Sequence, residues 1–446
     1  MGRAAPGQPP PSRAVYLSVT AKFLLAQGAA VVWLGLSVWL SLPWLNELAG
    51  AITIVPAVVI ITLLAYGPGW ILAFLAASLL LDRQPPLVVS NPTDPVTVLI
   101  AARNEAERIE ETLAYITRQD YRGPIEILVV DNGSTDGTRV LVEAVGAATA
   151  LNVRCISEPR PGKSYALNTG LAATRTELVI TVDADTLLHR RAVRHLVARL
   201  SSAPDDVRAV AGSVLVRNSR DTIWTRMQEW DYFLGIASVK RMQGLYQGTL
   251  VAQGAFSLYR KDAVKAAGGW PDAIGEDIVL TWHLMREGAR IYYEPSAVAF
   301  TDAPAHLVRF ARQRARWARG MIEGIRSVRP WQQPRWLSRF LTSIDVLIPF
   351  LDVTYALVWI PGLALAATGR FWIVGIYTLA VLPLSFAVNA LLYHYQRRRV
   401  FDVLGLRVRR NFLGFLGFVL LYQMLMSPIS VVGYTQELLR ARRHWK

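Results

Sequence analysis

The stretch VTVLIAARNE, residues 96–105, decides the fold, because an apolar strand runs directly into a polar turn. Its apolar part lacks the alternation of a strand that faces water on one side. Comparable strands, IEILVVD ending at Asp131 and ELVITVDAD ending at Asp185, follow with helical stretches between them. Continuous apolar strands separated by helices predict an α/β domain with a parallel sheet that is covered on both faces.

The chain as a whole is too apolar for an ordinary soluble enzyme. It has 446 residues, of which 52% are hydrophobic and 18% charged. Runs without charged residues flank the α/β region, and a transmembrane helix needs roughly 20 such residues. We therefore predict an N-terminal membrane region over residues 1–81 with about two helices, an aqueous domain over 82–330, and a C-terminal membrane region over 331–446 with about three. The uncharged runs are residues 23–46, 48–81, 353–369, 371–396 and 411–436.

The formal net charge of +15 is explained by arginines and lysines beside the apolar runs. Such flanks are typical of the cytoplasmic side of a membrane. We expect residues 67–69, Gly-Pro-Gly, to bend or break the long run 48–81, leaving one span and an interfacial segment. The aqueous domain is then cytoplasmic, in a multi-pass protein of the inner (plasma) membrane. Both ends of the last run are basic, so either one C-terminal segment is re-entrant or interfacial or the C-terminus lies outside.

Polar residues follow three of the predicted strands at the point where each strand ends. Each alone is commonly a turn or a helix cap. Because the carboxyl ends of parallel strands meet at one edge of a sheet, ligands bind there, and three such ends together indicate a site. These residues are Arg103, Asn104 and Glu105 after the first strand, Asp131 and Asn132 after the second, and Asp183 and Asp185 after the fourth.

Two of these motifs suit a phosphate-containing ligand. In VDADT, Asp183 and Asp185 stand at a strand exit, where paired carboxylates hold a hard divalent cation that also takes phosphate oxygens. The Asp-x-Asp tripeptide is common in proteins, so the prediction of a metal site depends on its position at the end of a strand. In RPGKSYALNTG, Lys163 follows a glycine turn at a predicted helix start, which suits an anionic phosphate.

Glu276 and Asp277 stand side by side at another predicted helix start, in GEDIVLTWHL. Acids in a first turn often only favour the helix dipole. If Asp277 faces the same crevice, it is placed to be a general base, with Glu276 shaping the local field. The preceding AQGAFSLYRKDAVKAAGGW, which contains Gln253 and Gly254, is a glycine-rich and aromatic approach to this helix.

The stretch RQRARWARG, residues 312–320, places Gln313, Arg316 and Trp317 within little more than one helical turn. Arginine pairs with diphosphate oxygens. A tryptophan face stacks on a sugar or lies at a membrane interface. Alone, the stretch is equally typical of a basic interfacial helix. Because it occurs together with the other motifs, a ligand-binding site is favoured.

Together these motifs resemble the family 2 inverting glycosyltransferases of the membrane-integrated, processive type, which include poly-N-acetylglucosamine, hyaluronan, chitin and cellulose synthases. The resemblance runs from about residue 97 to 320 and rests on the order and spacing of AARNE, VVDNGSTDGT, GKSYALNTG, VDADT, GED and QRARW. It implies a cytosolic GT-A (Rossmann-like) domain inserted between N-terminal and C-terminal transmembrane helices.

The resemblance also implies a role for each motif. The donor's uridine lies against the first two strand ends, the diphosphate near Lys163, and Mg²⁺ or Mn²⁺ on the DAD motif. Asp277 is the catalytic base, with Glu276 beside it. The second strand reads DN where many relatives have DD, so the exact uridine contact is open. The implied donor-binding residues are Ala102, Arg103, Asn104, Glu105, Asp131, Lys163, Asp183, Gln313 and Arg316; the metal ligands are Asp183 and Asp185; the acceptor-binding residues are Trp317, Gln253 and Gly254.

The implied reaction is inverting, metal-dependent transfer from a UDP-sugar to the end of a growing β-linked polysaccharide, coupled to export across the membrane. The segments around Gln253 and Asp277 look closest to poly-β-1,6-N-acetylglucosamine synthases, which favours UDP-N-acetylglucosamine as donor. Acidic and aromatic residues in the C-terminal region are candidates to line an export path, although such aromatics also anchor at interfaces. The candidates are Asp345, Asp352, Tyr355, Trp359, Tyr377, Tyr393 and Tyr422.

Three alternatives remain open from the sequence. The nearest is a non-processive enzyme that glycosylates a membrane lipid, for which the acceptor is a glycolipid precursor. A non-catalytic export subunit is disfavoured by the intact DAD, ED and QxxRW motifs. A nucleic-acid partner is not expected, because no basic stripe with interleaved aromatics lies outside the membrane flanks. A separate small membrane subunit remains a candidate partner.

Overall fold

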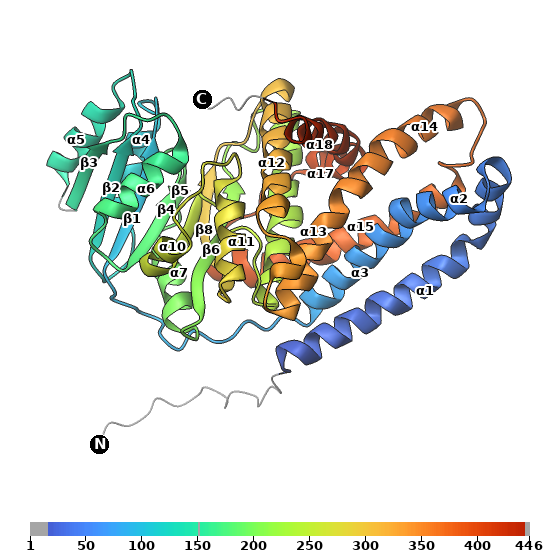
Figure 1. Ribbon diagram of the computed structural model, residues 1–446, viewed down its shortest axis with the longest axis horizontal. Coiled ribbons are helices and arrows are strands. Elements are labelled where there is room, and N and C mark those ends of the chain that lie inside the picture. Colours follow the sequence, from blue (N-terminus) through green and yellow to red (C-terminus); the bar gives the residue numbers. More distant parts are fainter. Residues whose placement is uncertain (1–16, 150–151, 442–446) are drawn as a thin grey trace.

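The apolar strands form one eight-stranded sheet in the computed structural model, which describes residues 17–149 and 152–441. The strand order is β3-β2-β1-β4-β7-β6-β8-β5, and Figure 1 shows the sheet beside a bundle of long helices. The strands are β1 (Val96–Ala102), β2 (Ile125–Asp131), β3 (Asn152–Ser157), β4 (Leu178–Val182), β5 (Leu187–Leu188), β6 (Val207–Val216), β7 (Phe256–Arg260) and β8 (Arg290–Thr301).

The expected parallel sheet is right for only one half of the molecule. Strands β3, β2, β1 and β4 are parallel, but β7 runs antiparallel to both β4 and β6, and β5 runs antiparallel to β8. The sheet is therefore mixed. A strand that is buried on both faces shows no alternation of polar and apolar residues, so its sequence does not reveal its direction.

Helices cover both faces of the sheet, as the apolar strands require. Along β1, Val98 and Ile100 pack into one apolar cluster with α4 and α7, whereas Leu99 packs into another with α6 and α11. Successive strand residues point to opposite faces, which explains why β1 is apolar throughout. The helices are α4 (Ile109–Thr117), α5 (Thr138–Ala148), α6 (Lys163–Ala173), α7 (Ala192–Ser201), α10 (Lys261–Ala266) and α11 (Glu276–Arg286).

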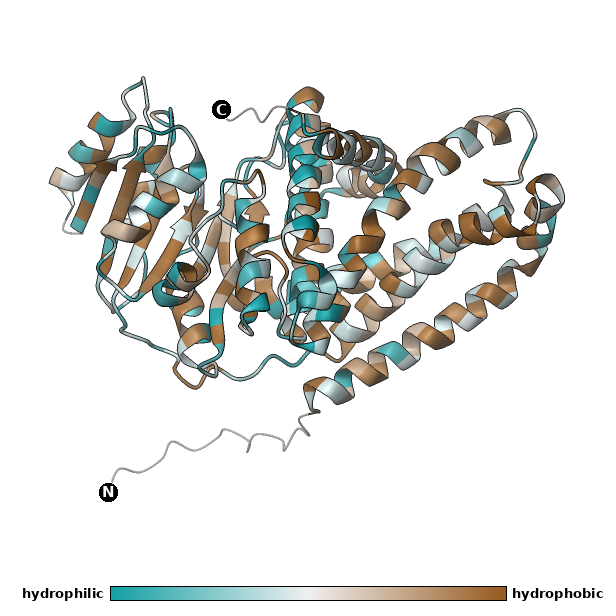
Figure 2. Ribbon diagram, in the orientation of Figure 1, coloured by the Kyte–Doolittle hydropathy of each residue, from teal (hydrophilic) through white to brown (hydrophobic). Residues whose placement is uncertain are grey.

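A second set of helices lies between the sheet and the long helices. Helix α12 (Leu307–Ser327) stands there in Figure 1, and Figure 2 shows that much of it is hydrophilic, in contrast to the long apolar helices. The segment α8 (Ile223–Trp230), η2 (Asp231–Ile236) and α9 (Ala237–Leu245) connects β6 to β7 on the same side. The QxxRW residues therefore lie where the sheet domain meets the apolar helices.

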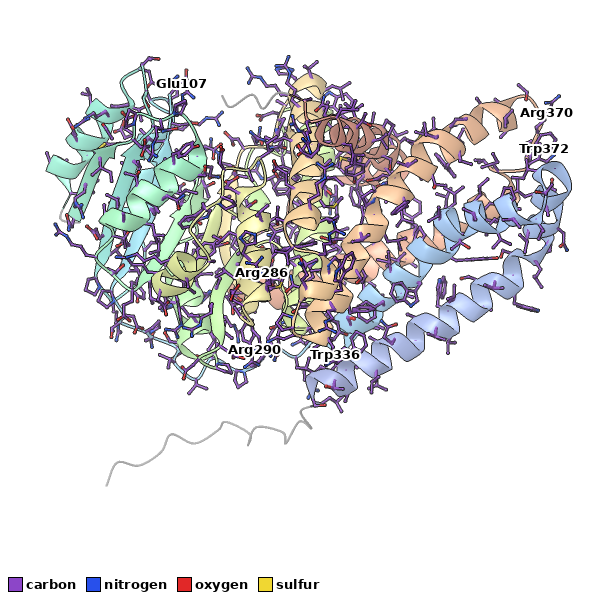
Figure 3. The ribbon with its side chains drawn as sticks, in the orientation of Figure 1. Glu107, Arg286, Arg290, Trp336, Arg370 and Trp372 are labelled. Atoms are coloured by element: carbon purple, nitrogen blue, oxygen red, sulfur yellow. The ribbon has the colours of Figure 1, made fainter. Side chains whose placement is uncertain are left out.

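Four helices in the described part of the chain are long and apolar enough to cross a membrane. They are Val19–Ile52 (α1), Ile54–Leu80 (α2 to α3), Trp336–Ala367 (α13 to α14) and Phe412–Leu438 (α17 to α18). Helix α15 (Ile376–Gln396) runs between the last two in sequence. Trp336 lies near the sheet domain and Trp372 at the far tip of the long helices, as Figure 3 shows. Tryptophans at the two ends of apolar helices are typical of membrane interfaces.

The sequence predicts a bend or a break at residues 67–69, and the chain does not break there. The helix continues through Pro68, and the chain turns instead at Thr53, which has a φ of 80°. A π-helical turn, η1 (Thr62–Tyr66), precedes the proline. Such a wide turn accommodates the backbone hydrogen bond that proline cannot donate. Two helices, α1 and α2 to α3, therefore precede the sheet domain.

Two of the candidates for an export path, Asp352 and Tyr422, are buried and make hydrogen bonds between elements. Asp352 is buried and accepts hydrogen bonds from Ser427 (2.7 Å) and Tyr434 (2.7 Å), so it joins α13 to α18. Tyr422 is also buried and donates to Asp231 over 2.8 Å. Side chains held in this way serve packing between elements. The side chain of Tyr377 lies outside those that the structure describes.

Candidate active site

The uridine-side residues predicted from the sequence come together at the ends of β1 and β2. Ala102 and Asp131 are partners in the register of the two strands, and both are buried. In the loop after β1, Asn104 has a φ of 55° and accepts a hydrogen bond from the Thr135 N–H over 2.8 Å. Ser134 N–H donates to Asp131 Oδ1 over 3.2 Å. The two strand-end loops therefore form one connected wall.

The asparagine in the DN pair has a structural reason. Asn132 is buried, and its Nδ2 donates to the carbonyls of Glu158 (2.9 Å) and Arg160 (2.7 Å). Its Oδ1 accepts from the Gly162 N–H over 2.9 Å. An amide both donates and accepts, whereas an ionised aspartate only accepts. Asn132 thus holds the loop that leads into Lys163.

Lys163 joins three of the predicted motifs. It is the first residue of α6, and its Nζ lies 2.7 Å from Asp183 Oδ1 and 3.3 Å from Glu276 Oε1. A Cβ atom on Gly254 would lie 2.8 Å from the Lys163 Nζ, so a side chain at Gly254 would displace the ammonium group. The lysine, the DAD motif, the GED motif and the loop at Gly254 therefore meet at one point.

Burial and neighbouring charges shift the pKa values of Lys163 and Glu276 in opposite directions. Burial disfavours the charged ammonium of Lys163, but the carboxylates of Asp183 and Glu276 outweigh burial and raise the pKa of Lys163. Burial raises the pKa of Glu276, which Lys163 partly opposes. The ammonium is therefore the stable cation of the site and Glu276 its buried partner.

Asp277 occupies the first turn of α11 with both carboxylate oxygens oriented. Its Oδ2 accepts from the Gly254 N–H over 3.2 Å, and its Oδ1 accepts from the Ile278 N–H over 2.8 Å. The Asp277 carboxylate is half-buried, whereas Glu276 is buried. A half-exposed, oriented carboxylate beside a cationic site has the geometry of a general base.

The DAD carboxylates fit a metal that is shared with a ligand. Asp185 Oδ2 lies 3.3 Å from Arg108 Nη1, and Asp183 faces Lys163, so both carboxylates face cations of the protein. In the described ranges no group of three or more His, Cys, Asp or Glu side chains could hold a metal alone. Mg²⁺ is commonly held by one or two carboxylates together with substrate phosphates, and this oxygen-only pair suits that arrangement.

Helix α12 brings the QxxRW motif against the GED loop. Gly320 and Gly275 approach backbone to backbone, and the Gly275 N–H donates to Glu323 Oε2 over 3.0 Å. On the same helix, Arg316 and Trp317 are exposed. Over residues 17–149 and 152–441, Gln313 Oε1 is a buried acceptor without a hydrogen-bond partner. The helix that carries these groups thus packs directly against the loop that leads into Glu276 and Asp277.

Residues 92–320 match the family described as Glycosyltransferase like family 2. This match covers half of the chain and spans all the motifs above. The chain belongs to the family 2 glycosyltransferases. The poly-β-1,6-N-acetyl-D-glucosamine synthase of Staphylococcus aureus (strain COL) is 30% identical to this glycosyltransferase over 281 residues, which are 62% of this chain and 67% of that one. The synthase of the same description from Staphylococcus epidermidis is 28% identical over 274 residues, 61% and 66% of the two chains.

The structural likeness confirms the GT-A fold of the glycosyltransferase. A mannosyltransferase from Pyrobaculum calidifontis, solved with GDP-Man and Mn²⁺, superposes with a TM-score of 0.59 at 24% identity. The likeness covers 86% of this chain and 99% of that one. It extends beyond the family match at residues 92–320. The predicted glycosyltransferase domain with flanking apolar helices is therefore correct.

Sequence reasoning missed Lys240, a buried basic residue of the glycosyltransferase. Lys240, on α9, donates to the Val251 carbonyl over 3.0 Å and to Gln253 Oε1. Burial lowers the pKa of Lys240 to about 7, partly opposed by Asp277. The Gln253 Nε2 donates to the Gly212 carbonyl over 2.8 Å, so both ends of this amide are bonded within the protein. This favours Gln253 as a holder of the loop at Gly254 over a direct acceptor contact.

Sequence reasoning also missed Arg108 and Arg314. Arg108 lies next to the DAD motif, and Arg314, the second residue of QRARW, is buried. In a basic chain, the sequence does not indicate which basic residues lie at a site, because most of them are solvated. Only the neighbours that the fold provides distinguish these two.

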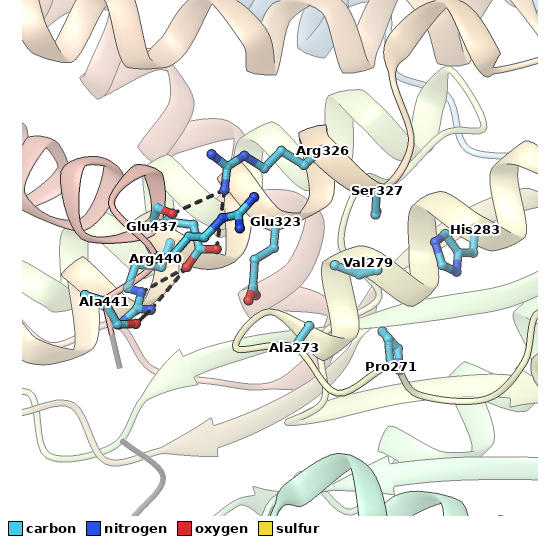
Figure 4. Close-up of a pocket in the computed structure, with 11 residues that line it drawn as sticks. Pro271, Ala273, Val279, His283, Glu323, Arg326, Ser327, Glu437, Arg440 and Ala441 are labelled. Atoms are coloured by element: carbon cyan, nitrogen blue, oxygen red, sulfur yellow. Dashed lines mark hydrogen bonds and ion pairs between the residues drawn. The ribbon is translucent and has the colours of Figure 1, made fainter. Parts of the chain in front are cut away.

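A distinct cavity lies away from these residues. It encloses about 730 Å³ between α11, α12 and the end of α18, and Figure 4 shows Arg326 and Glu437 at its edge. His283 and Ser327 line it as well. None of the residues predicted to bind donor, metal or acceptor is among its lining residues. This cavity is therefore separate from the candidate active site at the strand ends.

Proposed function

We propose that this glycosyltransferase transfers N-acetylglucosamine from UDP-N-acetylglucosamine to the end of a growing β-linked polysaccharide. The observation that carries the proposal is the meeting of Lys163, Asp183 and Glu276 beside Asp277, against the helix with the QxxRW motif. The names of the two staphylococcal relatives support N-acetylglucosamine as the sugar.

The chemistry follows from the arrangement of charges. Asp277 takes the proton of an acceptor hydroxyl, whose oxygen attacks C1 of the donor sugar as the bond from C1 to the diphosphate breaks. One displacement inverts an α-linked donor to a β-linkage. Lys163 and Arg316 stabilise the negative charge that develops on the departing UDP. Asp183 and Asp185 would hold Mg²⁺ or Mn²⁺, which when bound neutralises diphosphate charge.

The roles of the remaining site residues are inferred from where they lie in the fold. The wall formed by the ends of β1 and β2 suits the uridine and ribose, since it offers backbone groups and the Asp131 carboxylate. The buried, unpartnered Oε1 of Gln313, as found in the described residues, is available to a substrate hydroxyl. Trp317 provides an exposed aromatic face for the acceptor sugar. Uridine-side residues are Ala102, Arg103, Asn104, Glu105 and Asp131.

The membrane helices support a cytoplasmic domain over residues 82–330. Lys22, in the first turns of α1, donates to the carbonyl of Arg83, just after α3, over 3.0 Å. The start of the first span and the end of the second therefore lie on the same side. Basic residues at that end favour the cytoplasm. The N-terminus and the catalytic domain then share that side of the inner membrane, where sugar nucleotides are made.

The apolar helix Phe412–Leu438 is proposed to be interfacial, which leaves an even number of C-terminal spans. Near its start, Asn411 donates to the Arg226 carbonyl of α8 over 2.9 Å. Near its end, Glu437 pairs with Arg319 of α12 over 3.2 Å. Both ends thus touch the catalytic domain, and Figure 1 shows α18 beside α12. The other helices, residues 336–367 and 376–396, would span and border an export path, with a small membrane subunit as a further candidate partner.

The test is UDP release by the detergent-purified chain with UDP-N-acetylglucosamine, UDP-glucose or UDP-glucuronate, with Mg²⁺ or Mn²⁺, followed by sizing of the product. A long polymer from UDP-N-acetylglucosamine alone is expected. Release that requires an added lipid acceptor and yields one sugar per lipid would replace the polysaccharide with a glycolipid product. Release with another donor only would overturn the choice of sugar.

A further inference from the structure

Arg314 is a buried cation enclosed by aromatic rings. Its side chain is 2% exposed, and its Cζ lies 4.2 Å from the ring centroid of Trp317, 5.2 Å from that of Phe310 and 5.6 Å from that of Tyr232. A guanidinium over an aromatic face is attracted by the ring's electron density, most strongly by tryptophan. The guanidinium therefore fixes one face of the Trp317 indole.

The charge of Arg314 is balanced by a residue that also reaches the C-terminal apolar segment (Phe412–Leu438). Arg314 Nη2 lies 2.9 Å from Asp231 Oδ2. The same oxygen accepts from the Tyr422 hydroxyl over 2.8 Å. The Tyr422 ring packs against Phe310, with centroids 5.7 Å apart. A continuous set of contacts thus runs from the C-terminal apolar segment to the Trp317 indole.

We propose that Arg314 is a positioning residue that holds the Trp317 indole in place for the acceptor sugar, and that Asp231 and Tyr422 tie this platform to the C-terminal apolar segment. The acceptor role of Trp317 rests on the proposed function. Removing one partner of a buried ion pair leaves an uncompensated charge, so Arg314 depends on Asp231, and Asp231 is held by Tyr422. The place where the acceptor binds is thereby fixed relative to the membrane.

Trp317 has the exposure that a platform needs. The residue is 39% exposed although one side of its indole is covered by Arg314. An indole that is backed by a cation and is 39% exposed offers a rigid surface for stacking. By contrast, Trp282 of α11 is fully buried.

The chain provides a matched control in the same apolar segment. Tyr434 donates to Asp352 over 2.7 Å, so it too is a buried tyrosine bonded to a carboxylate. That pair joins α18 to α13, and within residues 17–149 and 152–441 no hydrogen bond, ion pair or ring contact links it to Arg314 or Trp317. Tyr422→Phe and Tyr434→Phe therefore remove the same hydroxyl from the same segment, and only the first reaches the proposed platform.

The first test is ¹⁹F NMR of the full-length chain labelled with 5-fluorotryptophan in detergent. Loss of one signal in Trp317→Phe assigns the resonance of interest. We expect Tyr422→Phe and Arg314→Lys to shift or broaden this signal and Tyr434→Phe to leave it in place. A signal that is unmoved by Tyr422→Phe, or moved equally by Tyr434→Phe, would overturn the network. This readout requires no substrate.

The second test is kinetic and separates acceptor from donor. With β-1,6-linked N-acetylglucosamine oligosaccharides as acceptors, Tyr422→Phe should raise the acceptor KM about 3- to 10-fold and leave the KM for UDP-N-acetylglucosamine unchanged. Tyr434→Phe should change neither. An equal rise in both constants, or no rise, would overturn the positioning role. If the wild-type chain transfers to no acceptor, the proposed function fails, and the fluorine signal alone decides the network.

Discussion

Gly275 and Gly320 lie so close together that neither has room for a side chain. A Cβ atom on Gly275 would lie 2.6 Å from the Cα of Gly320, and one on Gly320 would lie 2.8 Å from the Cα of Gly275. These atoms are backbone and cannot rotate away. The helix that presents Trp317 is thereby held directly against the loop that presents Glu276 and Asp277.

Gly320→Ala should therefore separate the two halves of the site. We expect kcat to fall about 100-fold, because displacement of a catalytic group by about 1 Å has that effect. Gly324→Ala is the matched control on the same helix, since its Cβ would meet the side chain of Ile278 at 3.2 Å rather than backbone. Steady-state kinetics with UDP-N-acetylglucosamine distinguishes the variants, and equal activity in both would refute the close approach as a functional feature.

Lys163→Met should weaken donor binding. The substitution removes the ammonium group that lies 2.7 Å from Asp183 and leaves that carboxylate and Glu276 facing each other. The dissociation constant of UDP, measured by isothermal titration calorimetry, should rise about 10- to 100-fold, as for loss of a charge-assisted contact. Lys265→Met, at an exposed position on α10, should bind as the wild type does. Unchanged affinity in Lys163→Met would remove Lys163 from the donor site.

Lys240 gives the protein a distinct dependence of stability on pH. Burial lowers its pKa from 10.5 to about 7, so between these values the unfolded chain carries a proton that the folded chain lacks. Stability from this group therefore rises with pH above about 7. Lys240→Met should lose that rise, amounting to at most about 2 kcal/mol between about pH 7 and about pH 9. The apparent unfolding temperature in detergent, measured as a function of pH, tests this prediction. The same pH dependence in the wild type and Lys240→Met would contradict it.

Much of the site followed from local patterns in the sequence. The helix expected after the GED glycine begins at Glu276, and the helix after the GK turn begins at Lys163. Such starts are encoded by neighbouring residues, as are the strand ends at Ala102 and Asp131. The direction of β7 could not be predicted from neighbouring residues, because a strand that is buried on both faces shows no alternation of polar and apolar residues. The turn at Thr53 rather than at Pro68 depended on a π-helical turn that only the fold reveals.

The partners of buried charges could not be predicted at all. Arg314 and Asp231 are far apart in sequence and meet only because α12 packs beside η2. Lys240 approaches the Gly254 loop because α9 lies beneath it. In a chain with 48 lysines and arginines, no sequence pattern separates these from solvated ones.

Asp185→Asn should reduce the affinity for Mn²⁺ in the presence of UDP. The substitution removes one of two carboxylates that fit a metal shared with phosphate oxygens. Electron paramagnetic resonance of free Mn²⁺ measures the bound fraction without any need for turnover. Asp302→Asn is the control, because Asp302 also approaches Arg108 (3.8 Å) but lies outside the DAD motif. Equal Mn²⁺ binding in Asp185→Asn and the wild type would contradict the metal site.

The central claim is that Asp277 is the base of a sugar transfer from UDP-N-acetylglucosamine. The decisive measurement is incorporation of radiolabelled N-acetylglucosamine into polymer by wild type, Asp277→Asn and Glu287→Gln, with UDP affinity measured alongside. Glu287 ends the same helix at an exposed position and is the matched acid-to-amide control. The account predicts a loss of about 10²- to 10⁴-fold for Asp277→Asn with unchanged UDP affinity, and normal synthesis by Glu287→Gln. Polymer formation by Asp277→Asn at the wild-type rate would contradict it.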